Sequence, residues 1–446
     1  MKINIDFSKT TGRIKPLHGV GNAPFLGCSE NLFHFLSDAG TPFSRLHDTG
    51  GAYGRNVFVD IPNIFRDENA DENDETSYDF AFTDWLLLNL QKHNVKPIYR
   101  LGVTIENHWR IKAYNIYPPK DPGKWARICE HIISHYNEGW ANGYHMDIEY
   151  WEIWNEPENG IPNKSNAMWL GTNEEYFKLY EITAKHLKEK FPEIKIGGYG
   201  SCGFYGLEKE RYEGDGLEVQ MHRLNFFDEF LTYAKENECP LDYFSWHSYE
   251  SVNITAKHAR YVREKLDSYG FTKTESILDE WDMNSPWNTE HEMVKLYSPK
   301  MAADSATMMC ALQNEAVDIA TAYQASFGTS IFHVWLNPLT QEPYKNYYAF
   351  VLFNELYKLK NQVECITVDS GDCRVIAASD GETKRVLIAN PTEEKIISEL
   401  LVKSGGEIKA LYVIDKDNDC KKTDQRLYKY NTKIKIDPES VILLEY

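Results

Sequence analysis

The chain has 446 residues, of which 42% are hydrophobic, 26% charged and 13% aromatic. This composition is typical of a folded soluble protein and excludes a disordered or fibrous one. The length suits one barrel of about 250 residues or more together with an accessory domain. The formal net charge of −19 disfavours nucleic acids and anionic membrane surfaces as partners.

The N-terminal segment MKINIDFSKTTGRIKPL interleaves charged and apolar residues and does not look like a secretory signal. No apolar run reaches the roughly 18 residues that a membrane-spanning helix needs. The eight cysteines form no CxxC pair and no repeated spacing; they are at positions 28, 129, 202, 239, 310, 365, 373 and 420. These features predict a cytoplasmic protein with free thiols, and neither a zinc site nor a disulfide framework.

From about residue 16 to residue 360, short apolar runs alternate with amphipathic segments, the pattern of repeated strand–helix units in a parallel sheet. The predicted strands lie near residues 17–20, 43–46, 97–101, 148–154, 194–198, 243–246, 276–279 and 318–323. Helices with apolar residues at three-to-four spacing are predicted at 79–94, 122–139, 173–192 and 222–238. Eight such units predict a closed (β/α)8 barrel, which we assign to residues 15–360.

After a further predicted helix at 346–360, the pattern changes to short alternating strands separated by Gly, Asp, Asn and Pro turns. Examples are RVIAASDG, KRVLIANP, ALYVIDKD and VILLEY. The opening MKINIDF alternates in the same way. The sequence therefore predicts a β-sandwich accessory domain made of residues 1–14 and 361–446, in which the N-terminal strand joins the C-terminal ones.

Polar and aromatic residues follow several of the predicted barrel strands, at the end where such barrels carry their active sites. Each could instead pack in the core, but together they suggest a sugar-binding rim, since aromatic rings offer stacking platforms. The candidates for substrate contact are His47, Asp48, Trp109, Asn155, His247, Tyr249, Trp281 and Trp335.

Two glutamates stand out because each directly follows an apolar strand. Glu156 comes after EYWEIW and Glu280 ends SILDE, and the fourth and seventh strands face each other across the barrel mouth. Retaining glycosidases need two carboxyls about 5–5.5 Å apart, one to protonate the leaving oxygen and one to attack the anomeric carbon. The tryptophans beside Glu156 are expected to raise its pKa. The pair predicts a glycoside hydrolase that needs no cofactor, and no HxH or HExxH spacing suggests a metal.

WNEPE, with PPKDPGKWARICEHIISHYNEG before it and DYFSWHSYE and LDEWDMN after it, resembles glycoside hydrolase family 39. That family contains β-xylosidases and α-L-iduronidases of the retaining barrel clan, with a C-terminal β-sandwich. The resemblance covers nearly the whole chain. It implies that Glu156 is the acid/base, Glu280 the nucleophile and Asn155 the partner of the sugar 2-hydroxyl. It also implies that His47 of RLHDTGG touches the sugar, and that His247 and Tyr249 lie beside the nucleophile.

Two segments depart from the family pattern, GVTIENHWRIKAYN after the third strand and AYQASFG after the eighth. Both are expected to line the sugar site, so the identity of the sugar stays open. We expect first an exo-acting β-D-xylosidase that cleaves short oligosaccharides or other glycosides. The alternatives are a glycosidase for a uronic-acid or arabinose derivative, favoured if a basic residue points into the pocket, and a non-catalytic carbohydrate-binding protein, disfavoured because both carboxylates are present. A homo-oligomer is left open.

Overall fold

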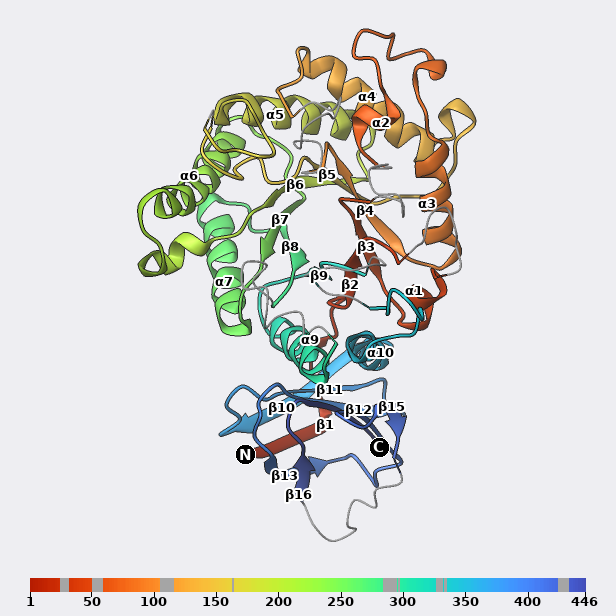
Figure 1. Ribbon diagram of the computed structural model, residues 1–446, viewed down its shortest axis with the longest axis vertical. Helices are drawn as coiled ribbons and strands as arrows, with labels where there is room; N and C mark the ends of the chain where they lie inside the picture. The colour runs from red at the N-terminus through yellow and green to blue at the C-terminus, as the bar shows by residue number, and fades with distance from the viewer. Residues whose placement is uncertain are drawn as a thin grey trace.

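The structure is a computed structural model that describes residues 1–24, 32–49, 59–104, 116–162, 164–283, 295, 297–325, 332, 335–423 and 433–446. Its larger part is a closed barrel of eight parallel strands ringed by helices, and its smaller part is a mixed β-sheet beside it (Figure 1). The predicted fold class, a (β/α)8 barrel with an accessory β-domain, is confirmed. No helix in the described part of the chain is both long and apolar enough to cross a membrane.

The barrel strands follow one another around the ring in sequence order, and all eight predicted strands are present. They are β2 (Gly19–Gly21), β3 (Phe43–Leu46), β4 (Lys96–Leu101), β5 (Tyr150–Ile153), β6 (Lys195–Ser201), β7 (Tyr243–Ser248), β8 (Glu275–Trp281) and β9 (Ile319–Ala322). Apolar side chains from six of these strands close the barrel interior: Phe43, Ile98, Tyr150, Tyr243, Ile277 and Ile319. Most of them lie at the beginning of their strands, so the opposite, C-terminal end is left for polar groups.

The helices pack around the outside of the barrel (Figure 1). They are α1 (His34–Asp38), α2 (Ile61–Ile64), α3 (Ala81–Lys92), α4 (Pro122–Asn137), α5 (Asn173–Lys190), α6 (Gly214–Glu236), α7 (Val252–Tyr269), α9 (Pro299–Leu312) and α10 (Lys345–Tyr357), with the short 3-10 turns η1 (Glu75–Ser77), η3 (Trp140–Asn142) and η4 (Tyr205–Arg211). Local signals fix some helix starts: Asp121 accepts from the Lys124 N–H before α4, and Thr172 forms a capping box with Glu175 before α5.

The accessory domain is one nine-stranded sheet. Its strands are β1 (Lys2–Arg13), β10 (Asn361–Val368), β11 (Arg374–Ser379), β12 (Lys384–Asn390), β13 (Ile396–Lys403), β14 (Ala410–Ile414), β15 (Asp419–Lys422), β16 (Lys433–Ile436) and β17 (Ser440–Glu445). β1 pairs antiparallel with β10 and parallel with β13, as expected for the N-terminal strand. One apolar cluster joins strands far apart in the sheet order, such as β12 and β16, so the sheet folds over its own core.

The other face of the accessory sheet packs against the barrel. Because side chains alternate along a strand, Ile388 lies in the accessory core while its neighbours Leu387 and Ala389 belong to the barrel cluster. Arg385 adds a polar contact, since its Nη1 atom donates to the backbone oxygen of Glu355 on α10 at 2.9 Å. The sheet therefore covers α9 and α10, at the side of the barrel (Figure 1).

Candidate active site

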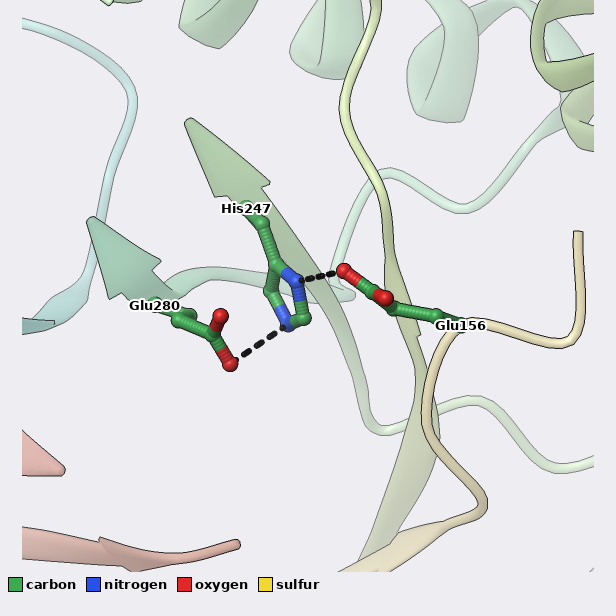
Figure 2. Close-up of side chains that lie close together, drawn as sticks. All are labelled: Glu156, His247 and Glu280. Atoms are coloured by element: carbon green, nitrogen blue, oxygen red, sulfur yellow. Dashed lines mark hydrogen bonds and ion pairs between the residues drawn. The ribbon is translucent and has the colours of Figure 1, made fainter. Parts of the chain in front are cut away.

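Glu156 is held at the end of β5 by its backbone. Trp154 and Glu156 both adopt left-handed backbone conformations, with φ of 74° and 49°. Residues other than glycine rarely adopt such conformations. The Glu156 N–H donates to the carbonyl oxygens of Tyr199 and Gly200, both at 3.0 Å. The turn after β5 is thus fixed to β6, and it directs the Glu156 carboxylate toward His247 and Glu280 (Figure 2).

His247 bridges the two glutamates (Figure 2). Its Nδ1 atom donates to Glu156 Oε1 at 2.8 Å, and its Nε2 atom lies 3.7 Å from Glu280 Oε2. One carboxylate oxygen from each glutamate and one imidazole nitrogen all lie within 4.8 Å of one another. The fourth and seventh barrel strands therefore do bring their terminal glutamates together, as the sequence indicates.

The charge state of this cluster differs from the expectation. Burial by itself would raise the pKa of Glu156, but the hydrogen bond and positive charge of His247 outweigh it and hold the pKa below its usual value. Burial likewise disfavours the charged form of His247, yet the charges of Glu280 and Glu156 raise its pKa. The prediction that neighbouring tryptophans raise the pKa of Glu156 is wrong for the free protein, because the hydrogen bond and charge of His247 outweigh the effect of burial on that pKa.

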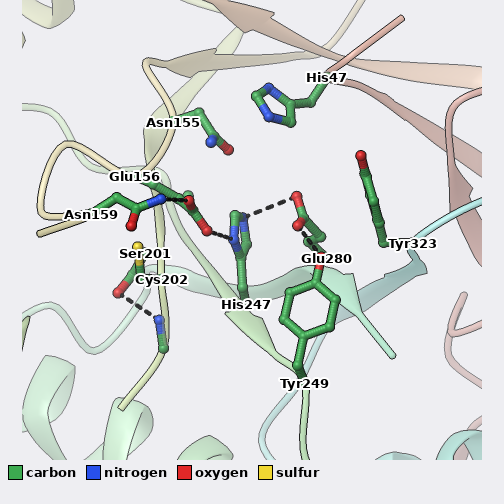
Figure 3. Close-up of polar contacts among 12 residues, drawn as sticks. His47, Asn155, Glu156, Asn159, Ser201, Cys202, His247, Tyr249, Glu280 and Tyr323 are labelled. Carbon is green, nitrogen blue, oxygen red and sulfur yellow. Dashed lines mark hydrogen bonds and ion pairs between the residues drawn. The ribbon is translucent and has the colours of Figure 1, made fainter. Parts of the chain in front are cut away.

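Glu280 is anchored by two donors. Arg45 Nη1 donates to its Oε2 atom at 2.9 Å, and the Tyr249 hydroxyl donates to Oε1. Arg45 also donates from Nη2 to Asn155 Oδ1 at 2.6 Å. Tyr249 therefore contacts Glu280 directly, whereas Asn155 is linked to it through Arg45. Figure 3 shows Tyr249, Asn155 and Glu280.

Arg45 forms the floor of the site and was not among the predicted site residues. It is almost fully buried, with Nε 2.6 Å from Asp279 Oδ2 and 2.9 Å from Glu152 Oε2. Burial opposes its charge, but Asp279, Glu152 and Glu280 raise the pKa of the guanidinium. Burial and Glu152 raise the pKa of Asp279 well above its usual value. Charged residues inside otherwise apolar strands were the available sequence signal for this floor.

A second carboxyl supports the turn that carries Glu156. Glu158 is fully buried, and its Oε1 atom accepts from the Ser201 hydroxyl and the Cys202 N–H, both at 2.8 Å. Burial raises the pKa of Glu158 to about 7. Asn159 donates from Nδ2 to Glu156 Oε2 at 2.7 Å. The Glu158 contacts tie the turn to the end of β6, and Figure 3 shows the contact between Asn159 and Glu156. None of these contacts was predicted.

His47 and Asp48 directly follow β3. The Asp48 Oδ2 atom accepts from the Tyr323 hydroxyl at 2.9 Å, and its Oδ1 atom lies 3.4 Å from His47 Nε2. Burial and the charge of Glu280 raise the pKa of Asp48 to about 7, whereas burial and Arg100 hold the pKa of His47 well below its usual value. Figure 3 shows His47 and Tyr323 facing the space above Glu280.

The predicted tryptophans do not join this group. Trp281 stacks near Phe350 of α10, and Trp335 packs against the same ring at a centroid distance of 5.2 Å. Both indoles are fully buried, so they pack in the core where the sequence indicated a sugar contact. Trp109 lies outside the described residues.

The cluster of Glu156, His247 and Glu280 offers the ligand types of a transition-metal site. Each of these side chains already has hydrogen-bond or ionic partners, and the Arg45 guanidinium lies 2.9 Å from a Glu280 oxygen. A cation at this point would face that fixed positive charge, so the cluster fits proton transfer and nucleophilic attack better than metal binding.

Comparison with known proteins gives a family match over most of the chain. The model of glycosyl hydrolases family 39 matches residues 48–363. A β-xylosidase of Geobacillus stearothermophilus is 26% identical over 225 residues, which cover 48% of this chain and 39% of that protein. A β-xylosidase of Caldicellulosiruptor saccharolyticus is 28% identical over 139 residues, covering 30% and 22%. The matched regions thus span two fifths or less of these relatives.

Solved structures share the whole fold. A glucosidase from Croceicoccus marinus superposes with a TM-score of 0.75 at 20% identity, covering 100% of this chain and 98% of that one. A monomeric β-xylosidase from Caulobacter crescentus gives a TM-score of 0.70 at 16% identity, covering 99% and 98%. At such identities the likeness concerns the arrangement of barrel and accessory sheet.

Proposed function

Because the chain belongs to glycosyl hydrolase family 39, we propose that it is a retaining, exo-acting β-D-xylosidase that cleaves short oligosaccharides through a glycosyl-enzyme. One observation carries the mechanism: carboxylate oxygens of Glu156 and Glu280 lie within 4.8 Å of each other. Retaining enzymes hold their carboxyls about 5–5.5 Å apart, whereas inverting enzymes need roughly 6.5–9.5 Å to fit a water molecule.

Glu280 is the nucleophile of this proposal. The Arg45 guanidinium donates to one oxygen of its carboxylate, and the Tyr249 hydroxyl fixes the orientation of the second oxygen. An anionic oxygen held in one place by two donors can attack an anomeric carbon without reorganising its surroundings. The new bond joins a Glu280 oxygen to the sugar, and the leaving oxygen departs on the Glu156 side.

Glu156 and His247 together supply the proton for the leaving oxygen. The pKa of the imidazole is raised while that of the carboxylate is lowered, so the proton of the pair rests on His247 Nδ1, 2.8 Å from Glu156 Oε1. As negative charge develops on the leaving oxygen, Glu156 takes up the proton from His247 and a proton passes from Glu156 to that oxygen. In the second step the ionised Glu156 removes a proton from water, which then attacks the glycosyl-enzyme.

The remaining sugar contacts are assigned to Asn155 and His47. Asn155 uses its carbonyl oxygen to accept from Arg45, which leaves its amide nitrogen for the 2-hydroxyl of the sugar. His47 is neutral, since its pKa is held well below the usual value, and it can accept from or donate to a hydroxyl. Neither residue brings a charge, as suits a neutral sugar.

The xyloside assignment draws its support from the β-xylosidase relatives. We further propose that the protein acts in the cytoplasm on imported oligosaccharides. The described cysteines are free thiols, which suits a reducing compartment.

A panel of 4-nitrophenyl glycosides tests the proposal. We expect the β-xyloside to give the highest kcat/KM, and NMR of the reaction to show β-xylose before mutarotation. The α-anomer appearing first would indicate inversion and contradict the double displacement. Turnover of a different sugar would keep the reaction class and replace the substrate, and no turnover of any glycoside would favour a binding protein.

A further inference from the structure

Asp48 is a carboxyl in the sugar site that neither step of the proposed reaction uses. It stands at the end of β3 in a left-handed conformation, with φ of 54°. Its Oδ2 atom accepts from Tyr323, while its Oδ1 atom is buried with no hydrogen-bond partner among the described residues. A buried oxygen without a partner is costly to maintain, and it marks a position where a ligand donor would be stabilised.

The partner of Asp48 comes from a segment that departs from the family pattern. Tyr323 belongs to AYQASFG, which follows the eighth barrel strand. In this part of the rim, β3 and β9 both neighbour β2. Side-chain hydrogen bonds connect residues that follow these three strands. Asn22 accepts from Thr49 at 3.0 Å and donates to Gln324 at 2.7 Å. Asp48 and Tyr323 are therefore held by a polar network that runs across three strand ends.

Among the described residues at this strand end, the charged side chains with measurable exposure are acidic. The side chains of Asp48, Glu156 and Glu280 are 17%, 15% and 10% exposed, whereas those of Arg45 and Arg100 are 1% and 0% exposed. These two arginines belong to β3 and β4 in the described part of the chain. Arg45 is surrounded by carboxylates, and Arg100 donates to Asp60 at 2.5 Å.

Arg223 of α6 is a further cation near the site, but it belongs to the leaving-group side. Its Nη2 atom lies 3.5 Å from Asn159 Oδ1. Asn159 lies beyond Glu156 as seen from Glu280 (Figure 3). A carboxylate on the sugar that occupies the space above Glu280 would meet Asp48 before Arg223.

We propose that Asp48, oriented by Tyr323, is a specificity-determining residue that accepts a hydrogen bond from a 3- or 4-hydroxyl of a neutral sugar and rejects uronic acids. This inference rests on the proposed glycosidase function and deepens it. Recognition comes from the Asp48 carboxylate, whose side chain is 17% exposed and whose Oδ1 atom makes no hydrogen bond to the described residues in the free protein. Rejection is electrostatic at pH 8, the pH chosen for the kinetic measurements, because most Asp48 carboxyls are then ionised. A sugar carboxylate would lie beside Asp48 and Glu280 in a site where charges are poorly screened.

The test compares three 4-nitrophenyl β-glycosides that share one ring configuration. The xyloside has no substituent at C5, the glucoside has a neutral one, and the glucuronide has an anionic one. For the wild-type protein we expect kcat/KM to be at least 100-fold lower for the glucuronide than for the xyloside. Asp48→Asn should lower kcat/KM for the xyloside about 10- to 100-fold, the scale of one hydrogen bond to a charged group. The same substitution should also lower the ratio of kcat/KM for the glucoside to kcat/KM for the glucuronide at least threefold.

Deoxy sugars make the test sharper. The loss caused by Asp48→Asn should disappear with either the 3-deoxy or the 4-deoxy xyloside, because the hydroxyl that Asp48 binds is then already absent. Tyr323→Phe keeps the ring and removes the donor to Asp48, so it should show a smaller loss with the same dependence on that hydroxyl. The matched control is Glu250→Gln, because Glu250 is a carboxylate near the site that pairs with Arg211. This substitution should leave the ratios of kcat/KM between the substrates unchanged.

The failures of the two proposals are distinguishable. A wild-type protein that cleaves no glycoside of the panel contradicts the proposed function itself. A wild-type protein that cleaves the xyloside but prefers the glucuronide overturns only the role of Asp48. So does an Asp48→Asn variant, folded by its Tm, that loses activity equally on intact and deoxy sugars or loses none.

Discussion

The barrel mouth and the accessory sheet bury different kinds of side chain. Beneath the mouth lie fully buried charged or polar groups, among them Arg45, Glu152, Asp279 and His247. The accessory core is built from apolar side chains such as Ile3, Ile388 and Ile436, and ion pairs such as Lys9 with Glu364 stay at its surface. Buried charges cost stability unless they are paired, so their concentration at one end of the barrel indicates that they serve chemistry there.

The comparison predicts that changes at the mouth affect rate and changes in the sheet affect stability. Glu280→Ala should give the largest effect of all. It removes the proposed nucleophile, so turnover of an aryl xyloside should fall by at least about 10⁴-fold, the scale seen when a member of a catalytic unit is deleted. Steady-state kinetics with a thermal melt would measure both quantities. Near-native activity would contradict the assignment.

Glu156→Ala should have a smaller effect that depends on the leaving group. A nitrophenolate scarcely needs a proton, so the covalent intermediate should still form, while hydrolysis slows by roughly 10²- to 10⁴-fold for lack of a general base. Azide needs no base, and it should restore turnover and give the β-glycosyl azide. With Glu280→Ala, azide should give the α-anomer, so the same anomer from both variants would show that the two roles are wrongly assigned.

Ile388→Ala in the accessory sheet should lower stability and leave activity unchanged. Ile388 is fully buried and pairs with Ile442 on β17, so its truncation should lower the free energy of unfolding by about 2–5 kcal/mol. Activity per folded molecule should not change. Ile397→Ala, at an isoleucine that is 64% exposed on β13, is the control and should alter unfolding little. A changed KM in the Ile388 variant would mean that the sheet influences the mouth.

Glu158→Gln tests whether the buried carboxyl that fixes the Glu156 turn lowers the free energy of unfolding. The folded pKa is about 7 and the usual value is 4.5, so between these pH values the native state binds more protons than the unfolded state. Wild-type stability should therefore fall as pH rises from 4.5 to 7, by up to about 3 kcal/mol from this group. The amide does not titrate, so the difference in Tm between variant and wild type should grow in favour of the variant across that range. A difference that is constant with pH would show that Glu158 does not titrate there.

Much of the architecture could be predicted because it depends on short stretches of chain. Strands such as SILDE and helices such as PGKWARICEHIISHYN are visible as local patterns of apolar residues, and parallel strands separated by helices leave few possible topologies. The alternating MKINIDF predicts a strand that joins the accessory sheet. Glu156 and Glu280 were predicted as the catalytic pair in the same way, since each is the acidic residue at the end of an apolar run, and the barrel brings their carboxylates together.

Only the tertiary structure decided how the groups of the site affect one another, because those contacts join residues far apart in the chain. The lowered pKa of Glu156 depends on His247, 91 residues away. The orientation of Asp48 depends on Tyr323, 275 residues away. Whether Trp281 faces a sugar or the core depends on the packing of α10. A sequence shows which residues a strand end presents, but distance and burial set their charges, and these are properties of the folded barrel.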